Sequence, residues 1–190
     1  MNHASKTVFT KQAMYQALKK LITVKPINKI TIKDITDACG LNRQTFYYHF
    51  KDIYDLLEWS FQEEFKFIDN YLQEPDNTWD EILTGAVMYI SQNKYICQCI
   101  VSGVGRDQLI LTLQNSIYEI IRKIILHSQV ANQIPDKFLD FTARFYTYAI
   151  SNYIFDWIKN GILESPESVV ENFRFVINHG LNSKRHHQTD

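Results

Sequence analysis

Two helix-start signals, at positions 31 and 42, flank a glycine in the segment ITIKDITDACGLNRQTFYYHF at residues 30–50. Thr31 fits an N-cap, with Asp34 completing a variant of the capping box, and Asn42 fits a second N-cap. Gly40 supplies the permissive backbone that a tight turn between two helices requires. The segment therefore predicts two short helices joined by a turn, as in a helix-turn-helix.

The rest of the chain is also helical in pattern. Only six glycines and four prolines occur in 190 residues, which favours helices with short connections over a many-turned β fold. An amphipathic helix is predicted from about Thr10 to Pro26, after a frayed start, and one long helix from Asp52 to about Glu74. We expect an all-α fold of about nine helices without a convincing strand. The expected division is a helix-turn-helix domain at residues 1–52, a helical regulatory and dimerisation domain at 53–182, and a disordered tail at 183–190.

Charge is divided unevenly along the chain. Residues 1–52 contain nine Lys or Arg and three Asp, a net charge of +6, and the whole chain carries −1, which leaves −7 for the remainder. A basic front on an acidic body is expected when one end of a protein meets a polyanion. A solvated helical face with surplus lysines is the alternative interpretation.

The second short helix combines a hydrophobic rear, where Phe46 and Phe50 suit a core, with a polar front. Residues at the start of a recognition helix reach base edges in the major groove, where Arg can bind guanine and Asn or Gln can bind adenine. Hydroxyl and imidazole groups further along suit phosphate oxygens. Half-buried packing remains the alternative for each tyrosine. The predicted DNA-binding residues are Thr31, Asn42, Arg43, Gln44, Thr45, Tyr47, Tyr48, His49 and Lys51.

Other classes of protein receive little support. No apolar run approaches the length of a membrane span, and three cysteines without CxxC spacing make a disulfide framework unlikely, so we expect a cytoplasmic protein. No nucleophile, phosphate-loop or metal-ligand motif occurs, so we expect no enzyme activity, no metal and no cofactor. A helical adaptor that binds only protein is the competing hypothesis, although it leaves the basic front unexplained.

The sequence IKDITDACGLNRQTFYYHFKDIYDLL resembles the N-terminal DNA-binding signature of the tetracycline-repressor (TetR) family of bacterial transcriptional regulators. The longer segment ACGLNRQTFYYHFKDIYDLLEWSFQEEF is similar to family members that control dihydroxyacetone kinase operons in Gram-positive bacteria. Ile53 stands where the family usually has lysine, Thr36 replaces a usual alanine and Gln44 a frequent glycine. These departures concern the operator sequence more than DNA binding itself.

The resemblance implies a homodimer that binds a palindromic operator, with a pocket and a dimer interface in the C-terminal domain. The pocket would take a small-molecule effector, or a protein co-regulator would act instead, and whether the result is repression or activation stays open. Arg144 is expected to be buried with an acidic partner or an anionic effector. The nearly all-round apolar segment FLDFTARFYTYAISNYIFDWI suits either a dimer interface or a monomer core. Predicted ligand-binding residues are Trp59, Tyr89, Tyr118 and Arg144, and predicted interface residues are Phe141, Tyr148, Phe155, Phe173 and Ile177.

Overall fold

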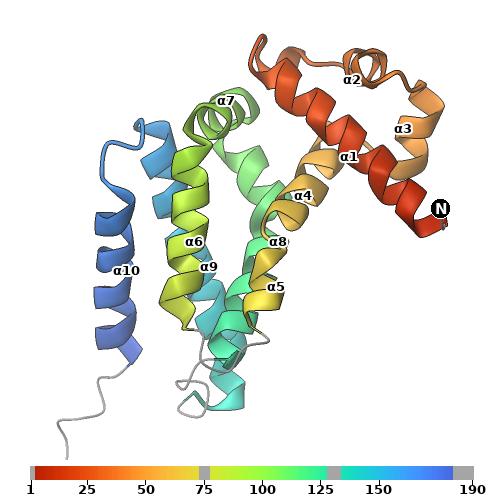
Figure 1. Cartoon of the computed structure of the whole chain (residues 1–190). Coiled ribbons are helices and arrows are strands. Elements are labelled where there is room, and N and C mark those ends of the chain that lie inside the picture. Colours follow the sequence, from red (N-terminus) through yellow and green to blue (C-terminus); the bar gives the residue numbers. More distant parts are fainter. Residues whose placement is uncertain (1–2, 73–77, 128–133, 182–190) are drawn as a thin grey trace, which may run out of the picture.

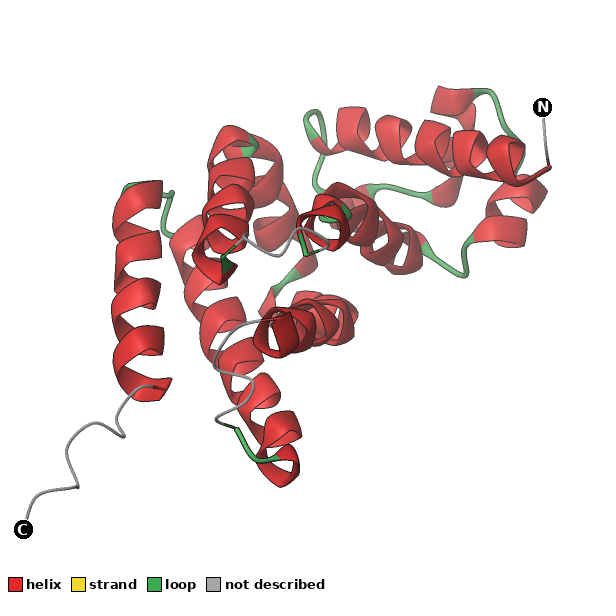
Figure 2. Ribbon diagram, turned by 60° about the horizontal axis from the view of Figure 1, so that its bottom comes forward, coloured by secondary structure: helices red, strands yellow, loops and turns green. Residues whose placement is uncertain are grey.

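The computed structural model describes residues 3–72, 78–127 and 134–181. Within these ranges the regular elements are all helices, which confirms the all-α expectation (Figures 1 and 2). The predicted tail at 183–190 lies outside the described residues. The elements are α1 (His3–Ile22), the 3₁₀ helix η1 (Ile27–Lys29), α2 (Ile32–Cys39), α3 (Arg43–His49), α4 (Ile53–Glu64), α5 (Phe67–Tyr71), α6 (Trp79–Gln92), α7 (Lys94–Val104), α8 (Arg106–His127), α9 (Asp136–Lys159) and α10 (Pro166–Leu181).

The predicted helix-turn-helix forms from local capping. Thr31 and Asp34 make a capping box at the start of α2, in which the Thr31 backbone N–H donates to the Asp34 carboxylate at 2.7 Å. Gly40 then takes the left-handed conformation, with φ of 68°, and ends α2. The Asn42 side chain caps α3 by accepting a 2.7 Å hydrogen bond from the Thr45 N–H. Local hydrogen bonds therefore fix both ends of the turn.

One hydrophobic core, which also includes Leu56 of α4, packs the first three helices together; residues 3–52 are called here the head. Phe46 on α3 is completely buried, as are Leu18 on α1 and Ile35 on α2. Leu41, in the turn, packs against the same cluster. Because α3 is only two turns long, this buried phenylalanine is what anchors it, and the opposite face of the helix is left free.

The long helix expected from Asp52 to Glu74 is interrupted in the structure. It divides into α4 and α5 at Phe65–Lys66, where the backbone tightens into bonds from Lys66 N–H to Glu63 O and from Ile68 N–H to Phe65 O. Phe65 stays buried at this break and stacks its edge against Tyr89 of α6, with ring centroids 5.5 Å apart. Aromatic packing, which helical periodicity alone does not reveal, accompanies the change of direction. The first helix also begins at His3, well before the expected Thr10.

Helices α4–α10 form the remainder of the molecule, called here the body (residues 53–181). Helix α8 lies against α9 and α4, and α10 covers α6. Arg174 of α10 fixes that last contact by donating from Nε and Nη2 to the Asp80 carboxylate at 3.1 and 2.8 Å. Both ribbon views place α10 at the opposite end of the molecule from the head (Figures 1 and 2). No described helix is long and apolar enough to cross a membrane.

Candidate DNA interface and apolar cavity

Helix α3 turns its polar side to solvent. Arg43 and Gln44 are exposed at its start, and Tyr47 and Tyr48 are 53 % and 74 % exposed further along. Phe46, on the opposite side, has no exposed surface. The helix therefore presents an arginine, an amide and two phenols on a rigid base, a set that suits both base edges and phosphate oxygens.

Three of the predicted DNA-binding side chains already have local partners. The side-chain oxygen Oδ1 of Asn42 accepts hydrogen bonds from the Thr45 N–H at 2.7 Å and from the Thr45 hydroxyl at 2.9 Å. The Thr31 hydroxyl likewise donates to Asp34 at 2.7 Å. These groups position α3 and α2. The Asn42 side-chain N–H₂ group and the exposed backbone around it can still contact DNA.

His49 sits half-buried at the end of α3, against the edge of Tyr48. Burial, together with the charge of Lys11, lowers the pKa of His49, so its imidazole is neutral at pH 7. Lys11 itself lies over the Phe50 ring, 5.0 Å from the centroid. Sequence reasoning did not single out Lys11, because its place in α1 gives no sign of a contact with the far end of α3. Lys51 is exposed, and its backbone N–H donates to Asp55.

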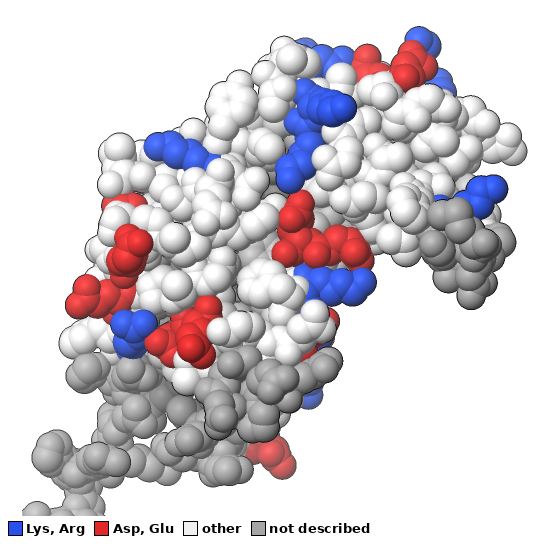
Figure 3. All heavy atoms as spheres, viewed as in Figure 1, with Lys and Arg blue, Asp and Glu red and all other residues white. Residues whose placement is uncertain are grey.

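Charged side chains of both signs lie on the head and on the body (Figure 3). On the face shown in Figure 3, groups of acidic side chains lie over the body, and basic and acidic side chains meet at the junction with the head. One such contact joins Lys19 of α1 to Glu64 of α4, with Nζ 3.3 Å from Oε1. In the described part of the head, Lys25 and Lys33 pair with the carboxylates of Asp34 and Asp37.

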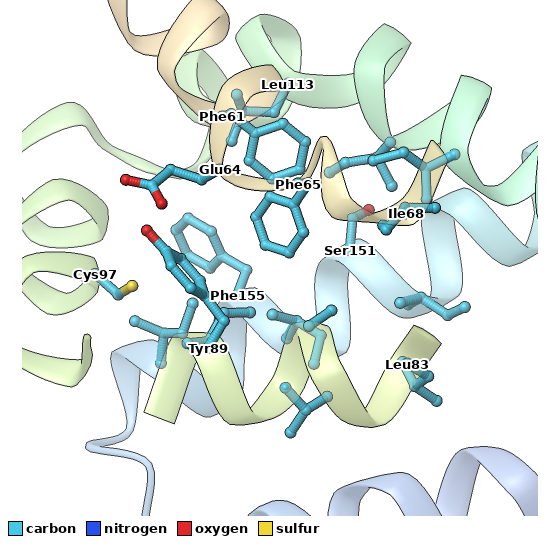
Figure 4. A pocket seen from close by; sticks show the side chains of 18 of the residues that line it. Phe61, Glu64, Phe65, Ile68, Leu83, Tyr89, Cys97, Leu113, Ser151 and Phe155 are labelled. Atoms are coloured by element: carbon cyan, nitrogen blue, oxygen red, sulfur yellow. The ribbon is translucent and has the colours of Figure 1, made fainter. Parts of the chain in front are cut away.

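The body contains a partly open apolar cavity of about 290 Å³ (Figure 4). Its walls come from α4, α6, α7, α8 and α9, with smaller contributions from α1, α5 and α10. Wall serines turn inward on their own helices: the Ser60 hydroxyl donates to Leu56 O and the Ser151 hydroxyl to Thr147 O, both at 2.6 Å. The apolar walls include Leu57, Phe61, Phe65, Leu83, Val87, Val101, Leu113, Ile121 and Phe155.

Polar groups collect at one corner of this cavity. The Tyr15 hydroxyl of α1 donates to Glu64 at 2.6 Å, and Figure 4 shows the Tyr89 hydroxyl directed at the same carboxylate. Burial would raise the pKa of Glu64, but hydrogen bonds from Tyr15 and Tyr89 and the charge of Lys19 outweigh it and lower that pKa. Glu64 is therefore an anion. Burial and the bond to this anion raise the pKa of both tyrosines, which stay protonated.

The four predicted ligand-binding residues are not brought together. Tyr89 lines the cavity, whereas Trp59 packs against Phe50 of the head, with ring centroids 5.8 Å apart. Tyr118 and Arg144 both bond to Asp140 on the outer surface, at 2.7 and 2.9 Å. The expectation that Arg144 is buried was wrong: its side chain is 53 % exposed, because it lies on the outer side of α9. Sequence reasoning missed Tyr15, Lys19 and Glu64, which are distant from one another in the chain.

Some of the predicted interface residues are exposed and others are buried. Phe141 and Tyr148 are 69 % and 45 % exposed on α9. Phe155, by contrast, is buried in the body core, and Ile177 of α10 lines the cavity. Phe173 is half-buried and packs on Tyr153. Large apolar side chains are exposed on both helices, and these are called here the apolar face: Phe138, Phe141, Phe145 and Tyr148 on α9, and Phe175 and Val176 on α10.

A helix-turn-helix with an exposed polar face, joined to a helical body with a cavity, is the arrangement of a DNA-binding transcriptional regulator. Comparison with known proteins supports this class. Residues 14–58 match the family of bacterial regulatory proteins of the tetR type, and residues 77–179 match a transcriptional regulator C-terminal region of the same family. The chain belongs to the TetR family.

Individual relatives agree with this assignment. The chain is 28 % identical over 97 residues to the HTH-type dhaKLM operon transcriptional activator DhaS of Lactococcus lactis subsp. lactis (strain IL1403). That match spans 49 % of this chain and 49 % of the relative, so the chain spans about half the length of the curated relative it matches.

Two solved structures share the fold over most of both chains. One is a dihydroxyacetone kinase operon activator DhaS, with a TM-score of 0.68 and 21 % sequence identity. The match covers 93 % of this chain and 98 % of the DhaS chain. The TetR family repressor AlkX from Dietzia sp. strain DQ12-45-1b, implicated in biodegradation of n-alkanes, has a TM-score of 0.61 at 20 % identity, with 90 % and 97 % covered.

Proposed function

We propose that this regulator is a homodimer that binds a palindromic operator through α3 and responds to a molecule bound in the body. The observation that supports it best is the exposed polar face of α3, held in place by the buried Phe46. A boundary near residue 52 would separate the DNA-binding domain from the regulatory one. The cytoplasm is the compartment we propose, because a regulator of this class must reach chromosomal DNA.

Each residue of the interface has a proposed role. Arg43 and Gln44, exposed at the start of α3, would face bases, together with the Asn42 amide and the Thr45 methyl group. Side chains that only set register would contact phosphates, and their loss would weaken binding to all sequences alike. The proposed phosphate contacts are Thr31, Tyr47, Tyr48, His49 and Lys51.

Dimerisation through the apolar face would place two heads on one side of the DNA. Isolated exposed aromatics are common on protein surfaces, but Phe141 and Phe145 lie together, with ring planes inclined by only 23°. Two copies of such a face are self-complementary about a two-fold axis. Half-sites about 34–36 Å apart, or slightly more, would fit the paired recognition helices.

The cavity supports control by an effector. A ligand that fits one arrangement of head and body better than another would shift the population of DNA-binding dimers. The named relatives include an activator and a repressor, so both directions of control occur among proteins of this fold.

Fluorescence anisotropy tests the DNA-binding proposal, on a duplex selected from a random pool and across a salt series. Arg43→Ala should lose about 1–3 kcal/mol and relax sequence preference, since it removes a base contact. Tyr47→Phe should weaken all duplexes alike. Lys159 is an exposed lysine at the C-terminal end of α9. Lys159→Ala serves as the control and should bind DNA as wild type does.

The salt series separates specific from generic binding. We expect a steep slope of log affinity against log salt concentration. The slope should be the same for wild type and Arg43→Ala, because phosphate contacts set it. If no duplex is enriched and Arg43→Ala binds as wild type does, α3 is not a recognition helix and the adaptor hypothesis takes its place.

A further inference from the structure

We infer that the effector is an uncharged, mostly hydrocarbon molecule with a single hydroxyl or carbonyl group at one end, and that this group binds at the corner formed by Tyr15, Glu64 and Tyr89. The inference rests on the proposed function in taking the cavity as the effector site. It adds the chemical class of the effector and the contact through which binding reaches the head.

The size and walls of the cavity set the hydrocarbon part. At about 30 Å³ for each heavy atom, the share of a water molecule in the liquid, 290 Å³ holds roughly ten heavy atoms. The wall hydroxyls of Ser60 and Ser151 are already donated to backbone carbonyls of their own helices. A ligand acceptor placed beside these two serines would therefore lose water without gaining a donor.

The charge at the corner excludes a charged end. Glu64 carries −1 and Lys19 carries +1, at 3.3 Å, so the corner is neutral. A carboxylate ligand would add a second anion beside Glu64, and an ammonium ligand would add a second cation beside Lys19. Neither excess charge has a counter-ion among the residues that line the cavity. An uncharged hydroxyl or carbonyl avoids this cost and can share the tyrosine hydroxyls.

The corner also joins two parts of the molecule. Tyr15 and Lys19 belong to α1 of the head, whereas Glu64 ends α4 and Tyr89 lies near the end of α6. A ligand group that competes for the Glu64 carboxylate or for the Tyr15 hydroxyl must alter the bond between α1 and α4. Occupancy of this corner is thus coupled to the position of the head through a direct contact between α1 and α4.

A matched ligand series tests the chemistry without DNA. Nonan-1-ol, nonane, nonanoate and nonylamine share one chain length, and calorimetric titration of the wild-type chain gives the affinity of each. The affinity for nonan-1-ol should be at least fivefold higher than the affinity for each of the other three ligands. Tighter binding of nonanoate or nonylamine, or no binding of any of the four, overturns the inference.

Two tyrosine variants locate the polar end. Tyr89→Phe removes one hydroxyl from the corner. It should lower the affinity for nonan-1-ol roughly 2–10-fold, which corresponds to the loss of one hydrogen bond, and leave the affinity for nonane unchanged. Tyr146→Phe removes a hydroxyl from another residue that lines the cavity, on α9 and not on a helix of the corner, and it should leave both affinities unchanged. Weakening of nonan-1-ol by Tyr146→Phe and not by Tyr89→Phe would place the polar end elsewhere and overturn the assignment.

The coupling to the head is measured separately, by anisotropy on the selected duplex. Nonan-1-ol should change the affinity of wild type for DNA at least fivefold, whereas nonane should change it less than twofold. Equal effects of the two ligands overturn the coupling. Wild type that binds nonan-1-ol but no duplex would contradict the proposed function and leave the ligand class intact. Wild type that binds the duplex but none of the ligands would contradict this inference alone.

Discussion

Gly103 of α7 lies directly against Ile27 of the head. A β-carbon added at Gly103 would stand 2.6 Å from Cγ2 of Ile27 and 3.2 Å from its backbone nitrogen. The Tyr95 hydroxyl, on the same helix, donates to Thr23 O of the head at 3.3 Å. Helix α7 is therefore in close contact with the head on one side, while Cys97 and Val101 line the cavity on the other.

Gly103→Ala should destabilise the protein by about 1–3 kcal/mol, because the new methyl group overpacks a contact that involves backbone as well as side chain. Chemical denaturation measures the change. Ile27→Ala removes the Cγ2 atom, so its cost should be smaller in the Gly103→Ala background than in wild type. Additive costs in the double variant would show that the two residues do not meet.

Asn42→Ala should lower stability by about 1 kcal/mol, since the cap of α3 loses its acceptor. Asn42→Asp keeps an acceptor at that position but adds a negative charge facing the DNA. Denaturation should leave Asn42→Asp close to wild type, while anisotropy should show weaker DNA binding than wild type. Equal DNA affinity for Asn42→Asp and wild type would remove Asn42 from the proposed interface.

Phe141→Lys should weaken the proposed dimer, with the dissociation constant raised at least tenfold, because a charge replaces an aromatic side chain that is 69 % exposed on the apolar face. Sedimentation velocity over a concentration series measures the change. Val24→Lys, at a residue 76 % exposed on the head, is the control and should remain dimeric. A dimeric Phe141→Lys would place the interface away from this part of α9.

Asp34 predicts a pH dependence of head stability. A hydrogen bond from Lys25, followed by those from Thr31, holds the pKa of Asp34 below its usual range. A lowered pKa stabilises the fold above the unfolded pKa, about 4, and this stabilisation is lost as the pH falls toward the folded value. Asp34→Asn should thus be less stable than wild type at pH 7, and the difference should shrink below about pH 4. A constant difference from pH 7 to pH 2.5 would contradict this.

Cys97 should react slowly with alkylating reagents. Burial raises the pKa of its thiol to about 11, so at pH 8 only on the order of one molecule in a thousand carries the thiolate. Alkylation by iodoacetamide, followed by mass spectrometry of peptides, should be roughly two orders of magnitude slower than for a free cysteine. Reaction at the rate of a free cysteine would mean that this wall of the cavity opens readily.

Local signals predicted the DNA-binding part of the molecule in detail. Thr31, Gly40 and Asn42 act where the sequence placed them, because caps and turns depend on neighbours three or four positions away. The exposed side of α3 followed from the same reasoning, since one buried phenylalanine determines which face of a two-turn helix points outward.

The cavity could not be predicted in the same way. Its polar corner joins positions 15, 64 and 89, and no pattern within one helix indicates that three helices meet there. The hydrophobic periodicity of α9 also did not predict which of its aromatic side chains are buried: Phe155 is buried and Phe141 is exposed. A helix that is apolar nearly all round gives no sign of which side the rest of its own chain covers, so Arg144 was assigned to the wrong side.

The position of Trp59 gives the protein an internal optical signal. Its indole ring packs on Phe50 at the end of α3, and the Lys11 ammonium group lies 5.5 Å from the ring. The other two tryptophans, Trp79 and Trp157, belong to the body. In a chain with Trp79→Phe and Trp157→Phe, emission from Trp59 would report how closely the head is seated on α4, in real time and without an attached dye.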